Sequence, residues 1–281
     1  MRIDSHHHIW DLNVRPQTWM QGDELKSISR TILINELEPE LDKANINYTV
    51  IVQTVPLVDE TPELLDLSIS HQKVCAVVGW LDLESEDIRP QLEKYLSHPG
   101  GKNLVSIRDM AQDKADPNWL LREDVIKNIH RVAEYGLTFD ILTRPPQLSA
   151  AVEMVKRSPN NTFVLDHISK PYIAKNEFQP WADQISQIAS NENVSVKVSG
   201  LFTEAKWSNW SNQTFRPYFD HILNSFSPSR MMFGSDWPVC LLAATYSQTI
   251  NLMEELTKEF TKTELESFWS GTAKQSYRLK V

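Results

Sequence analysis

The chain has 281 residues, of which 41% are hydrophobic and 23% charged, a balance typical of globular proteins. Its 28 Lys and Arg residues against 37 Asp and Glu give a net charge of −9, which argues against nucleic-acid or anionic-membrane binding. No stretch reaches the ~18 apolar residues of a membrane span, and the N-terminus lacks a signal-peptide pattern. Cys75 and Cys240 lie far apart beside apolar residues, which favours free thiols and a cytoplasmic location.

Eight short runs rich in β-branched residues predict β-strands. Each run is almost continuously apolar rather than alternating, which is typical of parallel strands covered on both faces. In chain order the runs are residues 2–9, 48–55, 74–83, 103–110, 137–144, 162–169, 194–201 and 230–237.

Segments with helical periodicity lie between these runs. Thr61 is a candidate N-cap with Pro62 at the first helical position, and Gly136 is a candidate left-handed C-cap. The last segment opens with a capping-box pattern from Thr261 to Glu264. The predicted helices are residues 61–72, 118–136, 149–159, 180–190, 215–226, 246–260 and 261–279.

The regular alternation of strand and helix predicts a parallel sheet. Eight such units favour a closed (β/α)₈ TIM barrel, an α/β fold of ~250 residues, with an extra C-terminal helix. An open doubly wound sheet is the alternative, but the chain has only 8 glycines and no Gly-rich phosphate loop after the first run. We find no linker composition, so we expect a single domain over residues 1–281.

Three consecutive histidines lie inside the first predicted strand. A purification tag carries about six histidines and flanking linker residues, so this run is better explained as part of the fold. Side chains alternate along a strand, which predicts that Asp4, His6 and His8 share one face while Ser5 and His7 share the other. If the first face points into the barrel, His6 and His8 lie about 6–7 Å apart, within reach of one metal ion.

Two later strands end in residues of the same chemistry. His167 ends the sixth run in "VLDHISKP", and Asp236 ends the eighth in "FGSDWP". Each residue alone could cap a helix, but active sites of barrels gather at the C-terminal ends of the strands. Together with His6 and His8, they suit a single zinc-like ion or a metal-free site that holds a carbonyl oxygen.

The chain resembles the amidohydrolase superfamily over nearly its whole length. The stretches "IDSHHHIWD", "SIRDM", "FDILTRPPQL", "LDHISKP", "KVSGL" and "FGSDWPV" occur in the order and at about the spacing of that family. Within it, the pattern is similar to the sugar-lactone lactonases, such as the L-fuconolactonases, and to the 2-pyrone-4,6-dicarboxylate lactonases. The resemblance implies a (β/α)₈ barrel, a lactone substrate and a site built on His6, His8, His167 and Asp236.

The chain also departs from the family pattern. The fourth strand offers no lysine or glutamate to bridge two metals, so we expect one divalent ion, zinc, or action without metal. The family often has Gly-Ile-Arg-His in that strand, where this chain has "SIRD": Arg108 is kept, and Asp109 should make the pocket less basic. Lys197 could bridge metals if carboxylated, but a salt-bridged lysine is the favoured interpretation.

We expect hydrolysis of an L-fuconolactone-like sugar-acid lactone, which requires an activated water, a polarised carbonyl and a proton for the leaving alkoxide. Asp236 would act as the base, with His167 and Arg108 in the catalytic group and the three site histidines polarising the carbonyl. Arg108 is also expected to clamp the substrate, because a guanidinium matches carboxylate or hydroxyl oxygens. The further candidates for contacting the substrate are Lys170, Gln53, Trp10, Arg144 and Trp237.

Two other functions remain open from the sequence. A metal-dependent decarboxylase of the same superfamily would carry a similar set of four residues, although "DHISKP" and "KVSGL" favour the lactonases. A barrel that only binds sugar acids would not need a base at Asp236. The expected partner is a small lactone, with no nucleic acid or membrane, and a homo-oligomer is possible.

Overall fold

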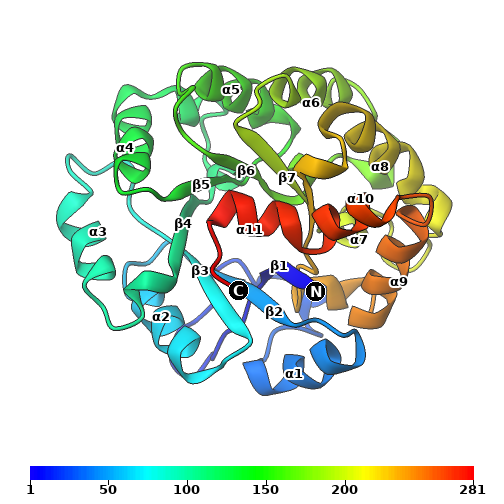
Figure 1. The fold of residues 1–281 in the computed structure, drawn as a ribbon, viewed down its shortest axis with the longest axis horizontal. Coiled ribbons are helices and arrows are strands. Elements are labelled where there is room, and N and C mark those ends of the chain that lie inside the picture. The colour runs from blue at the N-terminus through cyan, green and yellow to red at the C-terminus, as the bar shows by residue number, and fades with distance from the viewer.

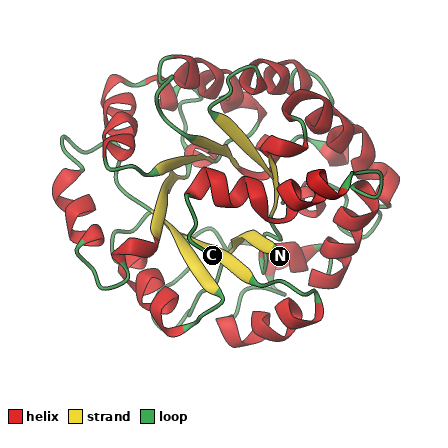
Figure 2. Cartoon of the chain, viewed as in Figure 1, coloured by secondary structure: helices red, strands yellow, loops and turns green.

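The computed structural model describes residues 1–281 and shows eight parallel strands forming a barrel with helices around it (Figures 1 and 2). Each strand pairs with the next in chain order, from β1 to β8. The ring closes where His7 bridges Trp237 and the Trp237 carbonyl accepts the His8 amide at 2.7 Å. The predicted (β/α)₈ fold is confirmed. The strands are β1 (Ile3–His7), β2 (Tyr48–Val52), β3 (Val74–Gly79), β4 (Leu104–Asp109), β5 (Thr138–Ile141), β6 (Phe163–Leu165), β7 (Val194–Val198) and β8 (Met231–Phe233).

Eleven α-helices accompany the strands, and three of them, α1, α3 and the four-residue α7, were not predicted. The α1 helix contains Pro39, and α3 is only eight residues long, so neither offers a long apolar repeat. The helices are α1 (Ile34–Lys43), α2 (Glu60–Ser70), α3 (Arg89–Leu96), α4 (Glu123–Glu134), α5 (Pro145–Lys156), α6 (Trp181–Ala189), α7 (Leu201–Glu204), α8 (Asn212–Phe226), α9 (Tyr246–Leu256), α10 (Lys262–Glu266) and α11 (Thr272–Tyr277). No helix is both long and apolar enough to cross a membrane.

The predicted helix ends are partly confirmed. Gly136 follows α4 with φ 74°, and Thr261 and Glu264 form the expected capping box. The prediction of Thr61 as an N-cap is wrong, because α2 already begins at Glu60 and the buried Thr61 hydroxyl accepts the Trp80 amide at 3.0 Å. The single helix predicted at the C-terminus is interrupted by a π-helical turn over residues 267–271, which separates α10 from α11.

The interior of the barrel is apolar at one end only. A cluster of buried side chains fills the end where the strands begin, and α11 covers it; Figure 1 shows α11, in red, crossing the barrel beside both termini. We call this cluster the floor. Its members are Ile3, Val50, Val52, Ala76, Val78, Val164 and Met232 from the strands, with Ala273 and Tyr277 from α11. Closure of the floor leaves the C-terminal ends of the strands as the accessible end.

The first strand contains a β-bulge that changes which side chains point inward. Asp4 pairs with Thr49 and His7 with Ile51, so β1 carries one more residue than β2 between these pairs. Asp4 therefore does not share the inner face with His6 and His8, contrary to the prediction from simple alternation. Its carboxylate accepts the Tyr246 hydroxyl of α9 at 3.0 Å, in the outer layer.

Candidate active site at the C-terminal ends of the strands

His6 and His8 point into the barrel and face each other. Their Nε2 atoms are 3.1 Å apart, and both rings are almost completely buried. His7 points away from them, and its Nε2 lies 3.0 Å from the Thr49 hydroxyl. The bulge thus places two of the three consecutive histidines in the site and the third in the packing around it.

The outer ring nitrogens of His8 and His167 are held by hydrogen bonds. His8 Nδ1 donates to the Val52 carbonyl at 2.7 Å, which leaves its Nε2 as an acceptor facing the site. His167 Nδ1 lies 2.8 Å from the Ser199 hydroxyl, so its Nε2 also faces inward. Such outer contacts fix the orientation of histidines that bind a metal or a substrate.

A strained turn after β6 presents His167. Residues 167–170 all have positive φ, between 45° and 58°, a conformation that costs non-glycine residues about 1–3 kcal/mol each. Gly200 approaches this turn with φ 64°, and a Cβ there would lie 2.9 Å from His167 Nδ1. The glycine of "KVSGL" is therefore needed for close packing against the His167 ring.

Asp236 completes the group from the segment after β8. Its Oδ1 lies 3.6, 3.9 and 3.8 Å from the Nε2 atoms of His8, His6 and His167, respectively. The Asp236 amide donates to the His6 carbonyl at 2.8 Å, which ties this segment to β1. The four residues predicted from the strand ends therefore converge on one point.

Burial and neighbouring charges set the protonation of this group. Burial lowers the pKa of His167 to about 3 and that of His6 well below its usual value, so both rings are neutral near pH 7. Burial alone would raise the pKa of Asp236, but the facing imidazoles of His167 and His8, with Lys170, outweigh it and lower that pKa. The carboxylate is thus ionised beside neutral imidazoles.

These residues fit a single divalent metal ion. Ligand atoms of His6, His167 and Asp236 all lie within 4.8 Å of one another, and His8 Nε2 is close to the same point. Tetrahedral ligand bonds of ~2.0–2.2 Å place ligand atoms roughly 3.3–3.5 Å apart, which is near the spacing seen here. Neutral imidazoles and an ionised carboxylate are the forms that bind a metal.

The group lies at the base of a cavity of about 720 Å³. His8, Arg108, His167 and Asp236 form its inner part, while Arg144 and Lys170 stand on its wall, as predicted. Other side chains on the wall were not predicted, and they come from loops whose sequence shows no motif. These include Thr18, Trp19, Gln112, Asp113, Thr203, Glu204 and Trp207.

Three predicted substrate contacts do not reach the cavity. Trp10 is buried under Trp19, with its Nε1 donating to the Arg30 carbonyl at 2.8 Å, and Trp237 is buried at the closure of the barrel. The Gln53 side chain is fully buried and donates to the Arg108 carbonyl at 3.3 Å. Their placement on the cavity wall is therefore corrected: all three support the wall from behind.

The positions of two charged residues, Arg108 and Asp109, differ from the sequence interpretation. Both terminal nitrogens of Arg108 are already bonded, to Asp166 Oδ2 at 3.0 Å and the Gln53 carbonyl at 2.6 Å, so its fork is not free to clamp a ligand. Asp109 faces Lys114 at 3.6 Å instead of the cavity, so it does not make the pocket less basic.

Comparison with known proteins identifies the class. A family model described as amidohydrolase matches residues 3–279, and the chain belongs to this family. The L-fucono-1,5-lactonase of Burkholderia ambifaria is 35% identical over 245 residues, which cover 87% of this chain and 83% of that protein. The L-fucono-1,5-lactonase of Burkholderia multivorans is 31% identical over 290 residues, covering 99% and 96%.

Solved structures show the same architecture. An amidohydrolase from Burkholderia multivorans with bound zinc superposes with a TM-score of 0.92 at 32% identity, covering 99% of both chains. A probable 2-pyrone-4,6-dicarboxylic acid hydrolase from Acinetobacter baumannii, with citric acid bound, gives a TM-score of 0.81 at 15% identity, also over 99% of both chains. The second likeness concerns the fold alone.

Proposed function

We propose that the protein hydrolyses an uncharged, polyhydroxylated sugar lactone, similar to L-fuconolactone, to the ring-opened acid. The observation that carries this proposal is the convergence of three imidazole Nε2 atoms on the Asp236 carboxylate at the base of the cavity. The relatives named L-fucono-1,5-lactonases, at 35% and 31% identity, support the choice of substrate class.

Asp236 would act first as a base and then as an acid. Its carboxylate takes a proton from a water molecule, whose oxygen attacks the lactone carbonyl carbon. The bond between that carbon and the ring oxygen then breaks, and the leaving alkoxide takes the proton back from Asp236. The product is a hydroxy acid, and Asp236 returns to its ionised form, so atoms and charge balance.

The histidines would hold the lactone carbonyl beside Asp236. When bound by His6, His8, His167 and Asp236, a divalent ion, which we propose is zinc, supplies Lewis acidity to the carbonyl oxygen. Burial keeps the His6 and His167 rings neutral, so they are ready to bind without first losing a proton. The Ser199 and Val52 contacts keep the rings oriented.

The charge of the cavity wall suits an uncharged substrate. On the wall, Arg144 and Lys170 are balanced by Asp113 and Glu204, so the formal charges of the wall cancel whether or not an ion is bound at the base. A dicarboxylate substrate would need an excess of positive charge. Lys170 and Arg144 can donate to sugar hydroxyls, and Glu204, whose side chain is 12% exposed, can accept from them.

A substrate panel tests this proposal. Acid release from aldonolactones, followed in a pH-stat and corrected for spontaneous hydrolysis, is expected for at least one sugar lactone. Carbon dioxide release from hydroxylated aromatic acids, measured in parallel, would instead show a decarboxylase. Binding of sugar acids with neither reaction would show a barrel without catalysis, and either of these results would overturn the proposal.

Metal content is a separate test. Elemental analysis of protein purified without a His tag should find about one zinc per chain, with lactonase activity falling on chelation and returning with zinc. Two ions per chain would contradict a site held by these four residues. Full activity without any ion would exclude the metal part of the proposal and leave the carbonyl oxygen to donors other than His8, whose Nε2 is an acceptor.

A further inference from the structure

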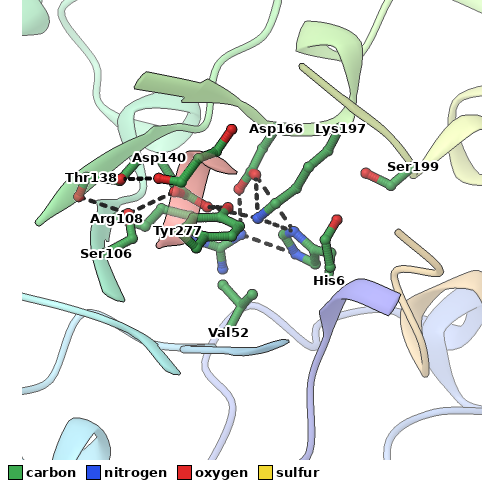
Figure 3. A network of polar contacts seen from close by, with 12 residues as sticks. His6, Val52, Ser106, Arg108, Thr138, Asp140, Asp166, Lys197, Ser199 and Tyr277 are labelled. Carbon is green, nitrogen blue, oxygen red and sulfur yellow. Dashed lines mark hydrogen bonds and ion pairs between the residues drawn. The ribbon is translucent and has the colours of Figure 1, made fainter. Parts of the chain in front are cut away.

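A chain of buried polar contacts connects the C-terminal helix to His6. Figure 3 shows it running from Tyr277 through Asp140 and Lys197 to the His6 ring. The chain passes through the interior of the barrel, between the apolar floor and the active site. All four side chains are at most 2% exposed, so no bulk water competes for their contacts.

Tyr277 and Ser106 hold Asp140 in place. The Tyr277 hydroxyl donates to Asp140 Oδ2 at 2.7 Å, and the Ser106 hydroxyl lies 2.7 Å from Oδ1. The helix that carries Tyr277 is tied to the barrel by a second contact, in which the Thr138 hydroxyl donates to the Ser276 carbonyl at 2.6 Å. Asp140 is thus oriented by a hydroxyl from each side.

Lys197 is the centre of the chain. Its Nζ lies 2.6 Å from Asp140 Oδ2, 3.0 Å from Asp166 Oδ1 and 3.2 Å from His6 Nδ1. Two carboxylates around one ammonium favour the salt-bridged lysine over a carboxylated one. Burial opposes ionisation of Asp166, but Lys197, His6 and Arg108 hold its pKa well below the usual range.

Both ring nitrogens of His6 lie close to charged groups. Lys197 Nζ is 3.2 Å and Asp166 Oδ1 3.5 Å from His6 Nδ1. On the other side of the ring, a terminal nitrogen of Arg108 lies 3.3 Å and His8 Nε2 3.1 Å from His6 Nε2. An ammonium and a guanidinium can only donate, and a neutral ring has one lone pair, so Lys197 and Arg108 compete for the His6 ring. The position of Lys197 therefore affects both the orientation of the His6 ring and its contact with His8.

We propose that the C-terminal helix positions His6 in the active site, with Tyr277 as a positioning residue that acts through Asp140 and Lys197. Loss of the Tyr277 hydroxyl leaves Asp140 Oδ2 with Lys197 as its only partner, so the two can move together and away from His6. The kinetic part of this inference rests on the proposed lactonase function. The orientation of His6 does not.

Tyr277→Phe removes only the hydroxyl that begins the chain, and Ser276→Ala is its matched control. Ser276 lies next to Tyr277 on α11, and its hydroxyl contacts Ser195 of β7 at 3.0 Å instead of Asp140. We expect kcat on the lactone to fall roughly three- to tenfold in Tyr277→Phe, with KM within about twofold, because the substrate contacts are untouched. Ser276→Ala should leave both constants near wild type. Thermal unfolding of both variants shows whether either one loosens the packing of α11 against the barrel.

The ring-nitrogen NMR signals of His6 provide a readout that needs no activity. In metal-free protein labelled with ¹⁵N-histidine, they should shift in Tyr277→Phe and not in Ser276→Ala, with His130 on α4 as an unaffected reference. Unchanged His6 signals in Tyr277→Phe would overturn the inference, whatever happens to kcat. If the wild type opens no lactone, the proposed function fails, but the NMR comparison still decides whether Tyr277 positions His6.

A second variant guards against poor folding. Lys197→Met removes the direct contact to His6 but leaves buried Asp140 without a cation and Asp166 with Arg108 alone, so it is expected to be far less stable. If Tyr277→Phe fails to fold, Ser106→Ala, which removes the other hydroxyl on Asp140, takes its place in the same comparison. A shift of the His6 signals in Ser106→Ala supports the proposed chain of contacts through Asp140 to His6. Unchanged His6 signals overturn the inference.

Discussion

The two ends of the barrel interior are built from the same eight strands but are chemically opposite. At the floor, Val50, Val164 and Met232 belong to a buried cluster that α11 covers, and their side chains are apolar. At the other end, His6, His8 and Asp236 point at one another, and a turn with four consecutive positive φ values carries a third histidine.

This difference shows how a barrel divides stability from chemistry. The floor has ordinary backbone and apolar side chains, so its contribution is burial. The active-site end holds buried polar groups and strained backbone, which lower stability and are retained where geometry serves a reaction. The polar chain from Tyr277 to His6 crosses between the two ends, so they are not independent.

The largest expected effect comes from the base at the active-site end. Asp236→Asn keeps the size of the side chain and removes its basicity, so kcat should fall ~10²–10⁴-fold after correction for spontaneous hydrolysis, while substrate still binds. Retention of more than about a tenth of the corrected rate would contradict the role of Asp236.

The wild-type pH profile follows from the same residue. The surroundings lower the pKa of Asp236, so its basic form persists below the usual aspartate value of about 3.9. Activity should therefore be lost only as the pH falls through that lowered pKa. An acidic limb centred near pH 6 in the kcat profile would assign the base to another group.

The three consecutive histidines allow inward-facing and outward-facing side chains to be compared within one segment. His6→Ala or His8→Ala should each reduce kcat by at least ~10²-fold if they hold the carbonyl. His7→Ala, which removes a buried ring contacting Thr49, should lower thermal stability but leave kcat within a few-fold. Equal losses of kcat at all three positions would break the assignment of faces.

A smaller effect is expected on the cavity wall. Glu204→Gln removes the charge of a side chain that faces Arg144 at 3.8 Å, and should raise KM roughly three- to tenfold with little change in kcat. The exposed Glu192→Gln is a control of the same chemistry away from the cavity. A fall in kcat with unchanged KM in Glu204→Gln would instead place this residue near the reacting atoms.

The smallest effect on the rate is expected at the floor. Met232→Ala leaves a cavity among buried side chains and should lower the free energy of unfolding by about 2–5 kcal/mol, measured by denaturant titration. Its kcat at a temperature where it remains folded should stay within about twofold of wild type. A large loss of kcat would mean that packing at the floor, and not only the polar chain, controls the active site.

The sequence predicted the fold and the convergent residues because both leave local patterns. Apolar runs mark the eight strands, and His167 and Asp236 lie just beyond the ends of β6 at Leu165 and β8 at Phe233. The placement of Asp4 was not predictable, because a bulge adds one residue to β1 without any glycine or proline to mark it. The α1 helix was not predicted because it contains Pro39, a residue that usually interrupts helices.

Residues that act through long-range contacts were the hardest to predict. Glu204 lines the cavity from the short α7 helix, and Asp166 supports the site beside His167, but no spacing in the sequence reveals either role. Trp10 and Trp237 were expected on the cavity wall because indoles stack on sugars. Burial in the packing around the barrel decided their positions instead.

A crystal structure of Asp236→Asn with the ring-opened sugar acid bound would show whether the reacting carbonyl group lies among the three imidazoles. We expect the carboxylate of the acid to lie among His6, His8, His167 and residue 236, with its hydroxyl groups toward Lys170, Arg144 and Glu204. A carboxylate bound elsewhere in the cavity, with none of the three imidazoles in contact, would contradict it.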